Sequence, residues 1–405
     1  MRRIELAMMG ALAMLASGCG GSGDGDNSAQ QTVQAARGNG LVAQGRHIFR
    51  FETFGDEAKW TDTLRMHEVI AAAVDPTTAL SVGLKVDAEA LPQSVKNGIA
   101  AGTVDLKSPA TTLALLKLDA IVGLKGRVDT ENGVDKLKRV GITCALCHST
   151  VDNSFAPGIG KRLDGWPNRD LNVGAIIALS PALSATEKAV FNSWGRGMYD
   201  PRHNIDGQNK PVVIPPAYGL AGIRQITFTG DGDDVAYWNR YVAVTQMGGL
   251  GTFSDPRLPL TITNGTADLV SDKLPALQAY QLSLGAPAAP AGSFDASAAA
   301  RGKLVFDAKG QCASCHTGSL FTDADSLLHP LGDSVVEPET PSYASRSATK
   351  MYRTTPLKGL WQHAPYFHDG TAATLEDVGT VYNNKRALGL TAQEIADLAQ
   401  YLKSL

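Results

Sequence analysis

This sequence contains few cysteines, carries little net charge and has few long hydrophobic runs. The 405 residues include five cysteines, and 37 Lys and Arg stand against 40 Asp and Glu, so the net charge is only -3. A basic patch for nucleic acid is therefore not expected. No Gly-x-Ser-x-Gly or Walker A motif occurs either. The hydrophobic fraction of 43% is that of an ordinary globular chain, long enough for about two domains.

The N-terminus, MRRIELAMMGALAMLASGC, predicts export from the cytoplasm. Arg2 and Arg3 precede an apolar run at residues 6–16, which is too short to span a bilayer and is followed by small residues. The final Ala-Ser-Gly-Cys also resembles a bacterial lipobox, in which Cys19 becomes the lipidated first residue. Ordinary signal-peptidase cleavage, with Cys19 discarded, is the alternative. We expect a signal at 1–19, a flexible tether at 20–40, and a periplasmic protein that touches the membrane only through a lipid anchor.

The four other cysteines fall into two Cys-x-x-Cys-His units, at residues 144–148 and 312–316. This unit is the attachment pattern of c-type haem. Two thiols on one turn can form thioethers with the porphyrin vinyl groups, and the adjacent histidine then lies under the iron as its proximal ligand. Thioredoxin-like pairs and four-cysteine zinc sites leave the histidine unexplained, so we expect two covalent haems. The residues concerned are Cys144, Cys147, Cys312 and Cys315 for attachment, with His148 and His316 as iron ligands.

The second unit lies in a segment that resembles a cytochrome c module. An alanine-rich helix with the pattern Gly302-x-x-x-Phe306 precedes the unit, and Ser293 or Asp295 can cap it. The chain ends on LTAQEIADLAQYLKSL, whose apolar residues recur at helical spacing behind a capping box that starts at Thr391. In cytochromes c the first and last helices cross, and a small glycine permits their close approach. Residues 293–405 are therefore expected to form one haem domain.

The same parts surround the first unit, spread apart by insertions. Gly45-x-x-x-Phe49 matches the first helix, and residues 273–284 match the last. Between them, PATTLALLKLDAIVGLKG predicts helix before the haem unit, and many turn signals follow that unit. We therefore predict a mainly α fold with a few short strands, built from two cytochrome c-like domains. The first domain, at 41–284, is enlarged by insertions, and an Ala/Pro linker at 285–292 joins it to the second.

The segment YRTTPLKGLWQHAPYFHDGTAATLEDVGTVYNN, residues 352–384, resembles the C-terminal signature of bacterial di-haem cytochrome c peroxidases and of the related methylamine-utilisation di-haem enzymes. In that family the helix after the His-Asp-Gly turn supplies the sixth ligand of the C-terminal haem, a methionine in the peroxidases and a tyrosine in the methylamine enzymes. The resemblance places this ligand at or close to Tyr382, in a helix that Thr374 can cap. His368, on the turn, would shape the pocket or, alternatively, be the distal ligand, and His363 is expected to be peripheral.

The sixth ligand of the first haem stays open. In the family peroxidases the N-terminal haem carries out the peroxide chemistry, and its displaceable histidine follows the haem unit closely. Here no histidine follows His148 until His203. The first iron is expected to be open or weakly held, or else bound by Met198, Met247, His203 or His67. Spacing does not select a catalytic acid or base.

The family also implies an interdomain calcium ion. Asp231, Asp233 and Asp234 could hold one. Their spacing is not that of an EF-hand loop, so a solvated acidic turn is the alternative.

By resemblance, the chain is expected to be a peroxidase-like oxidoreductase. It would take electrons from a small cytochrome c or cupredoxin and reduce hydrogen peroxide. Two alternatives stay open: a periplasmic electron-transfer cytochrome, and a di-haem oxygenase or oxidase that acts on an organic or protein substrate. The sixth ligands separate enzyme from carrier, because a strong ligand favours electron transfer and an open position can bind peroxide.

Overall fold

The computed structural model describes residues 25–258, 260–336 and 341–405. The expected signal and lipobox, with Cys19, lie outside these residues. The chain divides into two compact units, 1–40 and 41–405. Helix α1 (Gly25–Phe51) begins before the second unit, so residues 25–40 are helical where the sequence predicts a tether. The stretch contains Ala, Gln and Arg, which are good helix formers, and this accounts for the difference.

Residues 41–405 contain more helix than strand, as expected of a mainly α fold, together with several short strands. The α-helices after α1 are α2 (Met66–Ala73), α3 (Pro76–Ser81), α4 (Gln93–Ala100), α5 (Pro109–Lys117), α6 (Ala145–His148), α7 (Val173–Ala178), α8 (Ala185–Asn192), α9 (His203–Asp206), α10 (Val235–Tyr241), α11 (Leu274–Ser283), α12 (Ala296–Asp307), α13 (Leu375–Arg386) and α14 (Ala392–Ser404). Shorter 3-10 and π segments are η1 (Ala58–Thr63), η2 (Ala88–Ala90), η3 (Val242–Met247), η4 (Ser271–Lys273), η5 (Cys312–Ser314), η6 (Leu331–Asp333), η7 (Ala344–Arg346) and η8 (Leu360–Gln362).

The strands of the described residues pair into small two-stranded sheets. β1 (Val86–Asp87) runs parallel to β5 (Ile159–Gly160). The antiparallel pairs are β2 (Leu124–Glu131) with β3 (Val134–Ile142), β4 (Ser149–Val151) with β6 (Arg162–Asp164), β7 (Met198–Tyr199) with β8 (Val212–Val213), and β9 (Gly251–Asp255) with β10 (Leu260–Asn264). No sheet is large enough to organise the fold, so helix packing and loops position the site.

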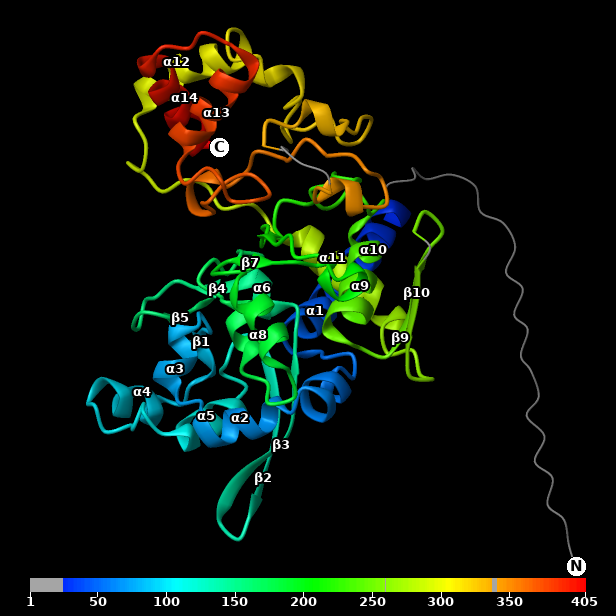
Figure 1. Cartoon of the computed structure of the whole chain (residues 1–405), viewed down its shortest axis with the longest axis vertical. Helices are drawn as coiled ribbons and strands as arrows, with labels where there is room; N and C mark the ends of the chain where they lie inside the picture. Colours follow the sequence, from blue (N-terminus) through cyan, green and yellow to red (C-terminus); the bar gives the residue numbers. More distant parts are fainter. Residues whose placement is uncertain (1–24, 259, 337–340) are drawn as a thin grey trace, which may run out of the picture. The chain divides into compact units, whose positions relative to one another are not determined.

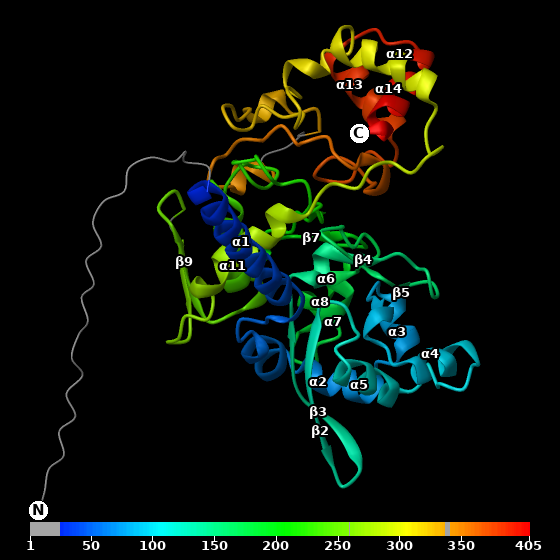
Figure 2. The ribbon, with the colours of Figure 1, turned by 180° about the vertical axis from the view of Figure 1, so that it is seen from behind.

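The hairpin β2–β3 corrects the expectation of helix through residues 109–126. The helix of that segment, α5, ends at Lys117, and the chain then turns into β2. Asn132 and Gly133 connect the strands with positive φ angles of 51° and 78°, which suit a two-residue hairpin turn. Figures 1 and 2 both show this hairpin projecting beyond the neighbouring helices α2 and α5.

Two pairs of helices cross in the same way. A Cβ atom placed on Gly302 of α12 would lie 2.0 Å from the carbonyl oxygen of Asp397 in α14, and one on Gly45 of α1 would lie 1.8 Å from that of Ala276 in α11. Only glycine permits such an approach. Figures 1 and 2 show α12, α13 and α14 packed together beside the C-terminus.

An aromatic pair sits at the same offset beside each crossing. Phe306 meets Tyr401 edge-on at 5.2 Å between ring centroids, and Phe49 meets Tyr280 at 5.5 Å. Each pair belongs to an apolar core of its own. This repeat is what two cytochrome c-like domains would produce, while the boundaries at 41–284, 285–292 and 293–405 stay a prediction.

The expected helix caps are present in the C-terminal part. The Asp295 side chain accepts hydrogen bonds from the backbone at the start of α12, so it is the cap rather than Ser293. Thr374 and Thr391 begin α13 and α14 with capping boxes. These caps fix where each helix starts, and thereby which face of α13 meets the neighbouring cavity.

We expect Gly302→Ala to lower the free energy of unfolding by about 1–3 kcal/mol, because the added methyl group would force α12 and α14 apart. Gly285→Ala is the matched control, since a Cβ there meets no atom within 4 Å. Denaturant unfolding of the two variants checks the expectation. Equal stability of Gly302→Ala and the parent chain would contradict the close crossing.

Candidate haem-binding cavity

The first Cys-x-x-Cys-His unit lies directly after β3. Helix α6 forms a single turn over the unit, which brings Cys144 and Cys147 to the same side. The carbonyl oxygen of Cys147 accepts a hydrogen bond of 2.9 Å from the backbone of Asn168. His148 Nδ1 lies 3.1 Å from the carbonyl oxygen of Pro215. When Nδ1 donates this bond, Nε2 keeps its lone pair for a metal, as in most metal-binding histidines.

The second unit repeats this arrangement after α12. The 3-10 turn η5 carries Cys312, and His316 Nδ1 lies 3.0 Å from the carbonyl oxygen of Phe321. Burial lowers the pKa of both histidines, that of His148 to about 4, so each is neutral at physiological pH. Both imidazoles are therefore held in the form that can bind iron through Nε2.

One cavity of about 820 Å³ receives both units. All four cysteines of the units line it, none of them in a disulfide, and His148 and His316 line it as well. Burial raises the pKa of the thiols, to about 12 for Cys144 and Cys147 and about 11 for Cys312. A roomy cavity with paired thiols and oriented imidazoles fits covalently held haem.

Tyr382, the expected sixth ligand of the second haem, lies in the wall of the cavity. It projects from α13 on the same face as Leu375 and Val378, which also line the cavity. Its ring lies 6.0 Å from that of Phe367, and burial raises the pKa of the phenol to about 12. The position suits a distal ligand, although coordination by Tyr382 stays a prediction.

His368 is held by aromatic side chains. Its Nε2 lies 3.2 Å from the hydroxyl oxygen of Tyr352, and its ring stacks on Tyr343 at 5.9 Å between centroids. The ring centroid of Phe228 lies 6.2 Å from that of His368. Burial lowers the pKa of His368. These contacts favour a residue that shapes the pocket over one that ligates iron.

His363 is not peripheral, contrary to the expectation from the sequence. Only 8% of its surface is exposed, and it lines the cavity. Its carbonyl oxygen accepts a 2.8 Å hydrogen bond from Arg169, and burial lowers the pKa of the ring to about 4. The short 3-10 turn η8 ends at the residue before it and directs it inward.

The candidates for the sixth ligand of the first haem differ in whether they line the cavity. Met247, at the end of η3, is 2% exposed and lines the cavity. His203 also lines it, with Nδ1 2.7 Å from the carbonyl oxygen of Gln208. Met198 and His67 are not among the described residues that form the cavity wall. The structure therefore favours Met247 and His203 as the residues to test.

Several polar residues of the cavity wall were missed in the sequence. The hydroxyl of Tyr199 donates a 2.7 Å hydrogen bond to the side chain of Gln246, and the ammonium group of Lys59 donates one of 2.6 Å to the Gln246 carbonyl oxygen. Arg169 and Arg353 also line the cavity. These residues are far apart in the sequence and belong to no motif, so only the fold brings them together.

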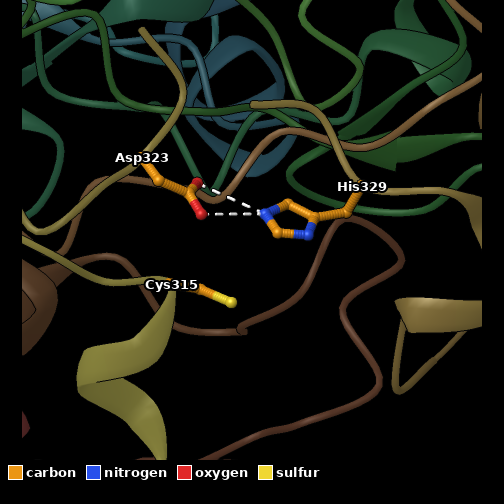
Figure 3. A group of neighbouring side chains, drawn as sticks. All are labelled: Cys315, Asp323 and His329. Atoms are coloured by element: carbon orange, nitrogen blue, oxygen red, sulfur yellow. Dashed lines mark hydrogen bonds and ion pairs between the residues drawn. The ribbon is translucent and has the colours of Figure 1, made fainter. Parts of the chain in front are cut away.

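Asp323 and His329 form a further unexpected pair beside Cys315 (Figure 3). His329 Nε2 lies 3.0 Å from a carboxylate oxygen of Asp323, and the potential ligand atoms of the three residues lie within 4.8 Å of one another. A thioether at Cys315 would remove its thiolate, which leaves too few ligands for zinc. The group therefore belongs to the surroundings of the second haem unit.

The acidic turn at residues 231–234 is not simply solvated. Asp231 is 4% exposed and pairs with the guanidinium group of Arg202. Its carboxylate also accepts hydrogen bonds from the Thr229 hydroxyl at 2.8 Å and the Ala348 backbone at 3.0 Å. Donors thus already surround the oxygens that calcium would need, and calcium with Asp233 and Asp234 stays a prediction without support here.

A family model described as "RoxA-like, cytochrome c-like" matches residues 351–386. Hydrazine synthase subunit gamma of Kuenenia stuttgartiensis is 31% identical over 143 residues, which is 26% of this chain and 40% of the subunit. The match thus spans less than half of that relative. A solved structure of the Kuenenia stuttgartiensis hydrazine synthase aligns at 21% identity and a TM-score of 0.33, covering 48% of this chain and 73% of that one. A solved structure of a MauG-like protein associated with microbial copper homeostasis aligns at 21% identity and a TM-score of 0.35. The alignment covers 52% of this chain and 77% of that one.

The family match and the curated relative, together with the geometry of the cavity, define the class of protein: the chain is a haem-binding cytochrome of the c type. The matched residues 351–386 fall almost wholly within the segment 352–384, whose resemblance to the di-haem cytochrome c peroxidases and methylamine-utilisation enzymes is described above. A cytochrome c-like match implies covalently bound haem and a general redox role. Such cytochromes are typically exported, and none of the described helices has the length and apolar character to cross a membrane.

Proposed function

We propose that the chain is an exported di-haem cytochrome with one haem at each Cys-x-x-Cys-His unit. Cys144 and Cys147 would attach the first haem over His148, in a domain at 41–284, and the second unit would do the same in a domain at 293–405. The observation that carries the proposal is the repeated geometry, in which each histidine directs Nδ1 to a backbone carbonyl oxygen at 3.1 or 3.0 Å within one cavity.

We further propose that it works as a peroxidase-like oxidoreductase in the periplasm. A small cytochrome c or cupredoxin would supply two electrons through one haem, and hydrogen peroxide would take them at the other with two protons to give two waters. The haems supply the redox chemistry. Tyr199 and Gln246 would orient a small polar substrate, because their hydrogen-bonded side chains line the cavity on the side of the first unit. The ammonium group of Lys59 would help to fix Gln246 through its hydrogen bond to the Gln246 carbonyl oxygen.

The expected result for the purified oxidised and half-reduced protein is one high-spin iron that reacts with peroxide. Optical and EPR spectra, recorded before and after one equivalent of peroxide, check this. Two low-spin irons that do not change on half-reduction and do not bind cyanide would instead identify an electron-transfer cytochrome. Oxygen uptake with an organic or protein substrate, without reaction with peroxide, would favour the oxygenase or oxidase alternative.

A further inference from the structure

Two arginines in the wall of the cavity combine buried guanidinium nitrogens that lack a hydrogen-bond partner with the absence of any carboxylate partner among the described residues. Arg169 donates one hydrogen bond, of 2.8 Å, to the carbonyl oxygen of His363, and its Nε and Nη1 are buried without a partner. Arg353 donates a hydrogen bond of 2.7 Å to the carbonyl oxygen of Gln225, and its Nε is likewise buried without a partner. A buried guanidinium group without a counter-charge is costly, because it loses hydration and gains no ion pair.

Three other arginines with buried side chains among the described residues are paired with carboxylates. Arg162 contacts Asp87 at 3.0 Å, Arg346 contacts Asp200 at 3.1 Å, and Arg202 pairs with Asp231. Arg169 and Arg353 therefore differ from these arginines in lacking a carboxylate partner. This difference coincides with their position in the cavity wall.

The cavity wall itself cannot supply the missing anions. Its described carboxylates are Asp200 and Asp333. Asp200 is committed to Arg346 and to backbone amides, and Asp333 lies 3.7 Å from His329. The counter-charge must then come from what the cavity holds, and each haem carries two propionate carboxylates.

We propose that Arg169 binds a propionate of the haem on His148 and that Arg353 binds a propionate of the haem on His316. The backbone next to each arginine contacts the corresponding unit. Asn168 donates its backbone hydrogen bond to Cys147, and the carbonyl oxygen of Thr354 accepts a bond from Thr322, next to the Phe321 that holds His316. The inference rests on the proposed function in requiring two haems.

Such pairs have an electrostatic consequence. A guanidinium group keeps a buried propionate ionised, and its positive charge favours the reduced iron over the more positive oxidised iron. Without the arginine the potential should fall. The unpaired propionate should also gain a higher pKa, because burial disfavours its charge. Its ionisation would then make the potential fall further as pH rises between about pH 5 and pH 8.

The test uses the full-length protein with haem attached, because covalent attachment holds the cofactor even when a propionate contact is lost. Arg169→Gln should shift the midpoint potential of the first haem downward and make it pH-dependent, and Arg353→Gln should do so for the second. Arg169→Lys and Arg353→Lys keep the charge and should restore most of the potential. Redox titration followed optically at several pH values gives these readouts without any turnover assay.

Arg386→Gln is the matched control, since Arg386 also lines the cavity but is exposed and donates to the carbonyl oxygen of Asp333 at 2.6 Å. It should leave both potentials unchanged. Potentials of Arg169→Gln and Arg353→Gln that equal the parent values at every pH would overturn the proposal, and so would an equal shift in Arg386→Gln. A haem content below two, measured by mass, would instead contradict the proposed function.

Discussion

Replacing Cys144 and Cys147 together by serine will leave a protein that carries one covalent haem. Serine is close to cysteine in shape but cannot form a thioether, so the proposed first haem would be held at most by His148 and would be lost on denaturation. The second unit has its own helix crossing, at Gly302, and its own pinned histidine, so its haem should remain. Intact mass and the haemochrome spectrum of the denatured protein count the haems.

The reciprocal pair, Cys312→Ser with Cys315→Ser, should also remove one haem, and the two pairs combined should remove both. Cys19→Ser is the control, because Cys19 belongs to neither unit and should change only lipidation. If the mass of the Cys144/Cys147 variant still included two haems, the first unit would not be an attachment site. Loss of both haems from either pair would show that the two sites do not form independently.

Local signals predicted the parts of the fold that depend on neighbours in the chain. The capping boxes at Thr374 and Thr391 are recognisable because cap and partner are three residues apart. The two glycine crossings could be found because the same Gly-x-x-x-Phe pattern occurs twice, at Gly45 and Gly302. Haem attachment could be expected because the chemistry needs two thiols and a histidine on one turn.

Other parts could not be obtained in this way. The run from residue 109 predicts helix throughout, but the helix ends at Lys117 and a hairpin follows, whose turn is marked by Asn132-Gly133. Arg169, Arg353, Tyr199 and Gln246 carry no motif, and only long-range packing places them around one cavity. The sequence predicts a peripheral His363, whereas the side chain is buried and its carbonyl oxygen accepts a hydrogen bond from Arg169, which is far away in the sequence.

Tyr382→Phe will convert the second haem to a high-spin form, if Tyr382 is its sixth ligand as the family resemblance implies. Phenylalanine keeps the ring beside Phe367 and the apolar face of α13, so the fold should be retained while the oxygen is lost. The pKa of the buried phenol is raised to about 12, so it would bind as phenolate only where a cation offsets its charge. EPR and optical spectra of the oxidised protein report the change.

Two matched variants decide whether the change belongs to Tyr382. Tyr366→Phe removes the hydroxyl of another tyrosine in the cavity wall, one that donates a 2.7 Å hydrogen bond to the carbonyl oxygen of Leu360, and should not alter the spin state. His368→Ala should also leave the spin state unchanged, because Nε2 of His368 is engaged by Tyr352 at 3.2 Å. A high-spin second haem in His368→Ala, with unchanged spectra in Tyr382→Phe, would show that the sixth ligand is His368 on the turn and not Tyr382 on α13. The aromatic side chains around His368 would then orient an iron ligand rather than close a pocket.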